Sequence, residues 1–217
     1  MLAAFVLVLA AAEPPPPAAA PAAPVAGSRV YTVDNRRSQL VLQVFKEGAA
    51  AALAHDHTVR ATEVSGSITA DPAAPESAKV SVTVLTKSLV NDEPLTRKQF
   101  GLDPEVPEKD RQAVLEAMRA DNQLDVAKFA SITFVSASVE RSGEKLAIVG
   151  DFTLHGVTKR IKMPIAVKWG DDGCVTGDGK IHFVQSDYGI KPYSAFLGAV
   201  KNKDEVILNV HLVGVPQ

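Results

Sequence analysis

The strongest constraint on the fold is a period of two in the apolar residues, which is clearest in the last third of the chain. Within residues 145–154, the apolar positions of one parity are Leu146, Ile148, Phe152 and Leu154. The same alternation returns in residues 160–169, 175–186 and 205–213. Because successive side chains of a β-strand point to opposite faces, this pattern predicts strands with one apolar and one polar face.

Nine segments carry this alternation or a cluster of β-branched residues, and most of them are bounded by Gly, Pro, Asp or Asn. They are residues 30–34, 39–45, 62–71, 78–86, 131–139, 145–154, 160–169, 175–186 and 205–213. Turn sequences at 141–144, 155–158 and 170–173 predict that the last five strands form an antiparallel meander. We therefore expect an all-β fold of eight or nine strands, closed into a barrel because closure removes exposed sheet edges.

A helical insert is expected between the fourth and fifth strands, where residues 91–128 lose the alternation. Residues 107–120 begin with a proline, carry two acids in the first turn and place Val114, Leu115 and Met118 on one face. This pattern predicts a short amphipathic helix, and a second helix is expected near residues 95–101. The insert is expected to cap the barrel or pack on its outside. A partner-binding face on the helix and a lid that gates ligand entry are the alternatives.

The first 28 residues differ in composition from the rest. Residues 1–12 are apolar and end in alanines, which is typical of a secretory signal peptide and too short for an integral membrane span. Residues 13–28 are rich in Pro and Ala and are expected to form a linker. The folded domain is then residues 29–217, and the signal predicts a periplasmic or secreted protein.

Several function classes find no support in the sequence. The chain has 23 basic and 25 acidic residues and no long basic run, so a nucleic-acid partner is not expected. No nucleophile elbow, P-loop, zinc-protease helix or dinucleotide-binding glycine pattern occurs, so neither an enzyme nor a cofactor is predicted. Cys174 is the single cysteine, which excludes an intrachain disulfide.

Four stretches together resemble the YceI-like family of exported, lipocalin-like barrels. They are residues 31–44 (YTVDNRRSQLVLQV), 122–136 (NQLDVAKFASITFVS), 150–165 (GDFTLHGVTKRIKMPI) and 185–190 (QSDYGI). The resemblance implies an eight-stranded antiparallel barrel whose interior binds a polyisoprenoid, an isoprenoid quinone or a similar amphiphilic lipid, with no established reaction. This chain departs from the family pattern at residues 35–38, Gln185 and Tyr188, and its insert at 91–122 is longer, which affects the choice of ligand head group more than the barrel.

Strand parity within this barrel predicts a set of residues that line a lipid-binding interior. They are Phe45, Val82, Val84, Phe134, Ile148, Phe152, Ile165, Val167 and Phe183. The turn at His155 and Gly156 is expected to be mainly architectural, because Gly tolerates a positive φ. Contact of His155 or Lys159 with a ligand head group is the alternative, and a homodimer is left open.

The rival hypothesis is a metal-dependent or stress-responsive periplasmic enzyme that uses His55 and His57. Residues two apart on a strand point the same way, so both imidazoles can reach one metal ion. Two histidines are an incomplete site, and spacing cannot decide between His155, His182 and His211 as the third ligand. No metal is predicted on this basis. A third hypothesis is a structural module whose barrel is filled by its own side chains.

Overall fold

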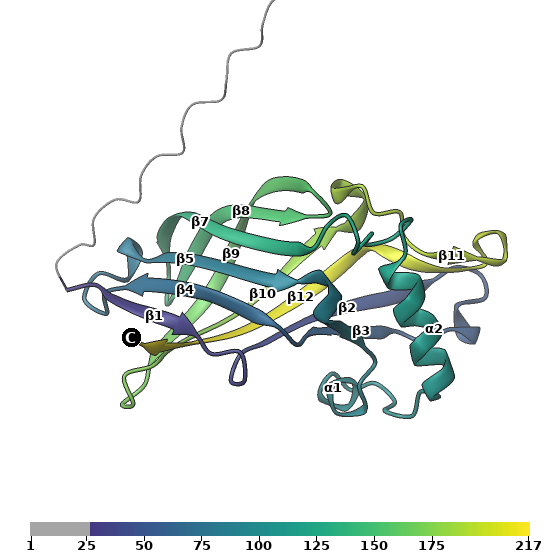
Figure 1. Cartoon of the computed structure of the whole chain (residues 1–217), viewed down its shortest axis with the longest axis horizontal. Helices are drawn as coiled ribbons and strands as arrows, with labels where there is room; N and C mark the ends of the chain where they lie inside the picture. Colours follow the sequence, from purple (N-terminus) through teal and green to yellow (C-terminus); the bar gives the residue numbers. More distant parts are fainter. Residues whose placement is uncertain (1–26) are drawn as a thin grey trace, which may run out of the picture.

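One antiparallel sheet closes on itself in the computed structural model, which describes residues 27–217 (Figure 1). The predicted signal peptide and nearly all of the predicted linker lie outside these residues. The strands are β1 (Arg29–Val33), β2 (Gln39–Glu47), β3 (His57–Ala61), β4 (Val64–Ala70), β5 (Lys79–Leu85), β6 (Leu89–Asn91), β7 (Ser131–Ser142), β8 (Lys145–Leu154), β9 (Val157–Trp169), β10 (Val175–Val184), β11 (Ser194–Ala195) and β12 (Val200–Pro216).

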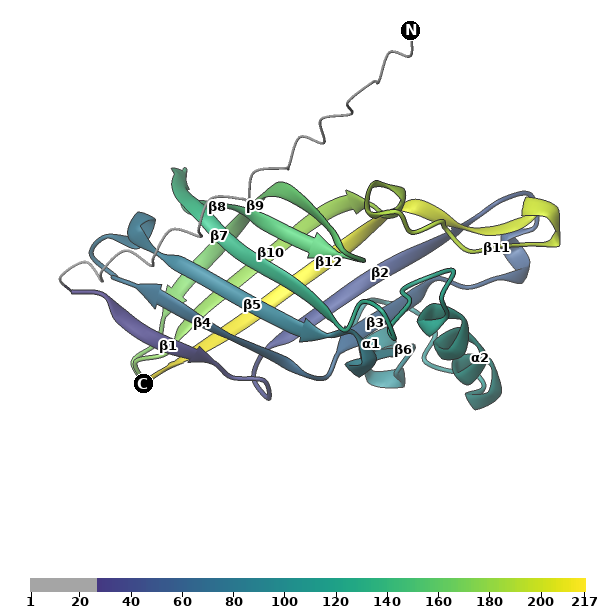
Figure 2. The same cartoon turned by 45° about the horizontal axis from the view of Figure 1, so that its top comes forward.

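The barrel is closed by β1, which pairs with β4 on one side and with β12 on the other. The ring of neighbours is β1, β4, β5, β7, β8, β9, β10 and β12, so the predicted eight-stranded antiparallel barrel is confirmed. The meander of the last five long strands, β7 to β10 and β12, is confirmed as well. Figure 2 shows β10 and β12 running behind β4 and β5 on the far wall.

Three of the barrel strands are each divided into two shorter strands. The pairs are β1 with β2, β3 with β4, and β5 with β6. Both β1 and β2 pair with β12. In turn β4 pairs with β1 and β3 with β2, and β5 pairs with β4 and β6 with β3. We call these the split strands, and we call β7, β8, β9, β10 and β12 the continuous strands. The sequence prediction missed β3, β6 and β11, because these strands are only five, three and two residues long.

The three interruptions lie side by side, and polar groups bind them together. The Asn35 amide donates to the carbonyl of Thr62 at 2.9 Å and accepts from the amide of Val64 at 2.7 Å. Both the hydroxyl and the amide of Thr62 donate to the carbonyl of Ser88, and the Ser88 hydroxyl accepts from the amide of Glu63 at 3.1 Å. These bonds replace the regular ladder where it is broken.

The turn between β8 and β9 consists of His155 and Gly156, both in the left-handed region with φ values of 52° and 73°. Two positive φ values in a two-residue loop match the right-handed twist of the flanking strands. A Cβ on Gly156 would lie 2.5 Å from the ring of Phe129, so close packing also requires glycine here. The positive φ that was expected at Gly156 is confirmed, and contact of His155 or Lys159 with a ligand head group stays a prediction.

The insert supplies two helices, α1 (Pro94–Gln99) and α2 (Glu108–Arg119), close to the two that were expected. Both lie at the end of the barrel where β3 and β6 are found (Figure 2). There β6 has a strand neighbour on one side only, β3, and α2 contacts β6. The helix thus covers a stretch of wall that no strand completes. Within residues 27–217, no helix is long and apolar enough to cross a bilayer.

Candidate ligand cavity and histidine cluster

The barrel encloses a cavity of about 410 Å³. Its lining is almost entirely aliphatic and aromatic, drawn from the inner faces of both the split and the continuous strands. The insert contributes Ala113, Val114, Ala117 and Met118 of α2, and Leu124 just after it. This volume lies within the range of about 300–1,000 Å³ that is usual for small-molecule sites, which are likewise mostly apolar.

Eight of the nine residues that strand parity predicted as lining side chains lie around this cavity. They are Val82, Val84, Phe134, Ile148, Phe152, Ile165, Val167 and Phe183. Phe45 does not line it: on β2 the cavity face carries Leu40, Leu42 and Val44. Phe45 belongs to the opposite parity, and its ring lies 6.0 Å from the ammonium of Lys203. Whether the eight residues contact a ligand stays a prediction.

Two of the lining residues, Phe152 and Phe183, form an aromatic cluster with Tyr188, which does not itself line the cavity. The rings of Phe152, Phe183 and Tyr188 meet edge to face, with centroids 5.5 to 5.7 Å apart, a favoured arrangement for aromatic pairs. Burial, followed by the nearby charge of Asp187, raises the pKa of Tyr188. Lys159 lies over the Tyr188 ring at 5.8 Å and pairs with Asp187 at 3.0 Å, so the structure already gives this lysine two partners of its own.

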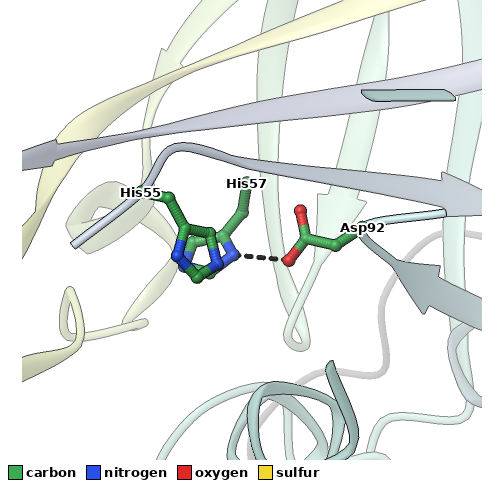
Figure 3. Close-up of side chains that lie close together, drawn as sticks. All are labelled: His55, His57 and Asp92. Carbon is green, nitrogen blue, oxygen red and sulfur yellow. Dashed lines mark hydrogen bonds and ion pairs between the residues drawn. The ribbon is translucent and has the colours of Figure 1, made fainter. Parts of the chain in front are cut away.

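Polar groups are few in the lining, and one of them is the imidazole of His57. Its Nδ1 lies 2.6 Å from Oδ2 of Asp92, a carboxylate with no exposed side-chain surface (Figure 3). The other carboxylate oxygen, Oδ1, accepts from Arg97 at 2.7 Å and from the amide of Thr58 at 3.1 Å. Arg97 in turn donates to the backbone carbonyls of Asp56 and Asp103. The imidazole is therefore held by a chain of buried, mutually satisfied groups.

The hydrogen bonds decide the charge of Asp92. Burial alone would raise the pKa of this carboxyl group, but the hydrogen bonds from His57, Thr58 and Arg97 outweigh burial and hold the pKa at about 2. Asp92 is thus ionised at neutral pH. A carboxylate can only accept, so when His57 is neutral its proton sits on Nδ1 and its Nε2 carries the lone pair.

His55 lies beside this group, with its ring centroid 4.6 Å from that of His57 (Figure 3). Burial, followed by the charge that His57 can carry, lowers the pKa of His55. Its Nε2 is buried and makes no hydrogen bond. The two histidines that sequence reasoning paired are therefore brought together.

The other three histidines lie elsewhere. His155 contacts the carbonyl of Tyr188, His182 pairs with Glu205, and His211 pairs with Asp178. None of them joins the group of His55, His57 and Asp92. Asp92 is the member of this group that sequence reasoning missed. It lies 35 residues from His57, and strand β6, which positions it, was not predicted.

Proteins of one family resemble this chain in sequence, and solved structures resemble it in fold. Residues 31–214 match the model of the YceI-like domain. A UPF0312 protein of Shewanella sp. strain ANA-3 is 35% identical over 176 residues, which are 78% of this chain and 81% of that protein. Protein YceI of Salmonella arizonae is 33% identical over 159 residues, covering 70% of each chain.

Two solved structures share the fold at low sequence identity. BcnA of Burkholderia cenocepacia superposes with a TM-score of 0.64 at 18% identity, over 84% of this chain and 99% of BcnA. A polyisoprenoid-binding domain from Saccharophagus degradans gives a TM-score of 0.56 at 13% identity, over 86% of this chain and 98% of that domain. At these identities the likeness concerns the barrel itself.

Proposed function

This chain belongs to the YceI-like family, and we propose that its barrel binds, and carries or stores, a polyisoprenoid or a similar amphiphilic lipid. The observation that carries the proposal is the apolar cavity inside the closed sheet. The polyisoprenoid-binding domain of Saccharophagus degradans, which has the same fold, supports this choice of ligand. The proposed role is that of a binding protein without a reaction.

The energetics suit an isoprenoid chain. Burying apolar surface contributes roughly 0.8 kcal/mol per methylene, so one five-carbon unit gains at most roughly 4 kcal/mol before ordering costs. Two or three buried units bring the gross gain to or above the roughly 8 kcal/mol of a micromolar complex. No catalytic group is needed for such a site, and the apolar lining provides the contact surface.

We further propose that the protein acts outside the cytoplasm. Residues 1–12 have the composition of a secretory signal peptide, and a carrier that shields an apolar chain from water is useful in an aqueous compartment beside a membrane. N-terminal sequencing of the chain from periplasmic extract tests this proposal. The expected result is an N-terminus within the Pro/Ala-rich residues 13–28, whereas an intact Met1 in the cytoplasmic fraction would contradict it.

Uptake of a hydrophobic fluorophore tests the cavity directly. Phe152→Asp places a charge on the wall and should abolish uptake, because an unpaired buried carboxylate needs water that an apolar cavity excludes. Thr153→Asp is the matched control: it adds the same charge at the next residue, whose side chain lies on the opposite face of β8 and bonds Thr158 at 2.8 Å. Lys159→Ala should leave uptake nearly intact. Equal loss in all three folded variants would contradict an apolar interior site.

A further inference from the structure

Besides holding His57 in the cavity wall, the group of His55, His57 and Asp92 brings together three side chains of types that bind metal ions. Each residue offers a donor atom, and these three atoms lie within 4.8 Å of one another. The residues come from the segment just before β3, from its first position, and from the residue after β6. Figure 3 shows both imidazoles next to each other on the same side of Asp92.

The hydrogen bonds assign different roles to the three residues. Both oxygens of Asp92 are already engaged, by His57 on one and by Arg97 and Thr58 on the other. Asp92 is therefore suited to orient His57 rather than to bind an ion itself. A histidine that donates one ring N–H to a carboxylate and offers the other nitrogen as a lone pair is the usual arrangement behind a metal ligand.

His55 supplies the observation that points to a ligand. Its Nε2 is buried without a hydrogen-bond partner, and an unsatisfied buried polar atom costs about 1–3 kcal/mol. The imidazole of His57 lies beside it, with ring centroids 4.6 Å apart. The lone pairs that these two rings offer are those of Nε2 in His55 and Nε2 in His57. A bound cation would satisfy both lone pairs at once.

We propose that His55 and His57 form a site for a divalent first-row transition ion of the zinc or copper class, with Asp92 as the residue that positions His57. Imidazole nitrogens favour these ions over Mg²⁺ and Ca²⁺, which prefer oxygen ligands. Two protein ligands leave positions open for water or for an oxygen atom of a molecule in the cavity, since His57 lines that cavity.

Two other histidine–carboxylate pairs in the chain provide matched controls. His182 lies 3.0 Å from Glu205 and His211 lies 2.7 Å from Asp178, and each of these histidines is about half exposed. Both therefore have the carboxylate of the proposed site but lack a second imidazole beside them. The remaining histidine, His155, also has a buried Nε2 without a hydrogen-bond partner, but the ring beside it is that of Phe129 and not a second imidazole.

Calorimetric titration of the untagged, chelator-treated full chain with Zn²⁺ alone tests the site. One ion per chain is expected, with at least a tenfold loss of affinity in His55→Ala and in His57→Ala. The His182→Ala/His211→Ala double variant should bind as the wild type does. Because the Nε2 of His55 makes no hydrogen bond, His55→Ala should fold normally, which a thermal melt would verify.

Electron paramagnetic resonance of the Cu²⁺-loaded chain gives a second readout. Nitrogen hyperfine structure from two imidazoles is expected in the wild type, and from one imidazole in either single variant. Absence of stoichiometric Zn²⁺ binding, or binding that survives both single variants and is lost in the double surface variant, would overturn the proposal. The site does not rest on the lipid: fluorophore uptake measured in the same variants shows which of the two proposals fails.

Discussion

The split strands and the continuous strands form one barrel by different means. In the continuous strands, apolar residues alternate toward the interior and ion pairs such as Arg160 with Asp151 lie outside. In the half of the barrel that the split strands form, which we call the split half, the hydrogen-bond ladder is interrupted three times and polar groups are buried. Among residues 27–217, the buried polar or charged side chains all fall between 58 and 97; they are Thr58, Thr86, Ser88, Asn91, Asp92, Thr96 and Arg97.

This difference shows where each half gets its stability. Alternation suffices where a regular ladder satisfies the backbone, but an interrupted ladder needs side chains to complete its hydrogen bonds. A buried polar network stabilises only when every member is satisfied, so removing one member leaves others unpaired at high cost. The split half is therefore expected to be more sensitive to polar substitutions than the continuous half.

The largest expected effect is that of Asp92→Ala. The change leaves Arg97, whose side chain is 2% exposed, without its carboxylate, and breaking a buried pair in this way costs about 3–5 kcal/mol. Urea denaturation at neutral pH measures the change in the free energy of unfolding. A loss below about 1 kcal/mol would mean that the network is no stronger than surface pairing.

Acid should remove part of the stability that the ionised Asp92 provides. The pKa of Asp92 is about 2 in the folded chain against 3.8 ordinarily. The contribution of its lowered pKa to the free energy of unfolding is therefore fully present above pH 4 and is lost as the pH falls through 2. The lowered pKa corresponds to about 2 kcal/mol. Urea unfolding of wild type and Asp92→Asn, compared at pH 5 and near pH 2, should show the gap between them shrinking by about this amount. A constant gap would contradict the lowered pKa.

A smaller effect is expected at the junction of the split strands. Ser88→Ala removes the hydroxyl that accepts from the amide of Glu63, which should cost about 1 kcal/mol. Ser138→Ala, an exposed serine on the continuous strand β7, is the matched control and should change stability by less than about 0.5 kcal/mol. Ser138 flanks a register shift between β7 and β8, so thermal melts of the two variants compare the junction with an exposed irregularity on a continuous strand.

The smallest effect is expected from a surface pair on the continuous strands. Arg160 donates twice to Asp151, but the two side chains are 55% and 45% exposed. Arg160→Ala should therefore cost less than about 1 kcal/mol, and less still at high salt. If it cost as much as Asp92→Ala, the contrast between the two halves would disappear.

The same contrast explains what could be predicted from the sequence. The continuous strands β7 to β10 and β12 follow from alternation, because each has one clearly apolar face. On β2, by contrast, apolar residues occupy both parities, with Val41 and Phe45 opposite Leu42 and Val44. Period alone could not choose its inner face, and Phe45 was assigned to the cavity although it lies outside it.

The candidate metal site was half predictable for a related reason. His55 and His57 are two residues apart, so sequence alone could pair them, but Asp92 reaches His57 only because β3 pairs with β6. Next to that pairing Thr62 bonds Ser88, 26 residues away in the sequence, and no local pattern reveals such a contact. The positive φ of 50° at Asp92 is likewise set by the tertiary structure.

The central claim, an apolar barrel that is hollow and occupied by lipid, is tested most directly by native mass spectrometry of the chain purified without detergent from bacterial cells. We predict a species heavier than the bare chain by the mass of an isoprenoid lipid, which disappears in Phe152→Asp and persists in Thr153→Asp. A bare chain in every sample, together with no uptake of added isoprenoid lipid by the folded wild type, would contradict the account.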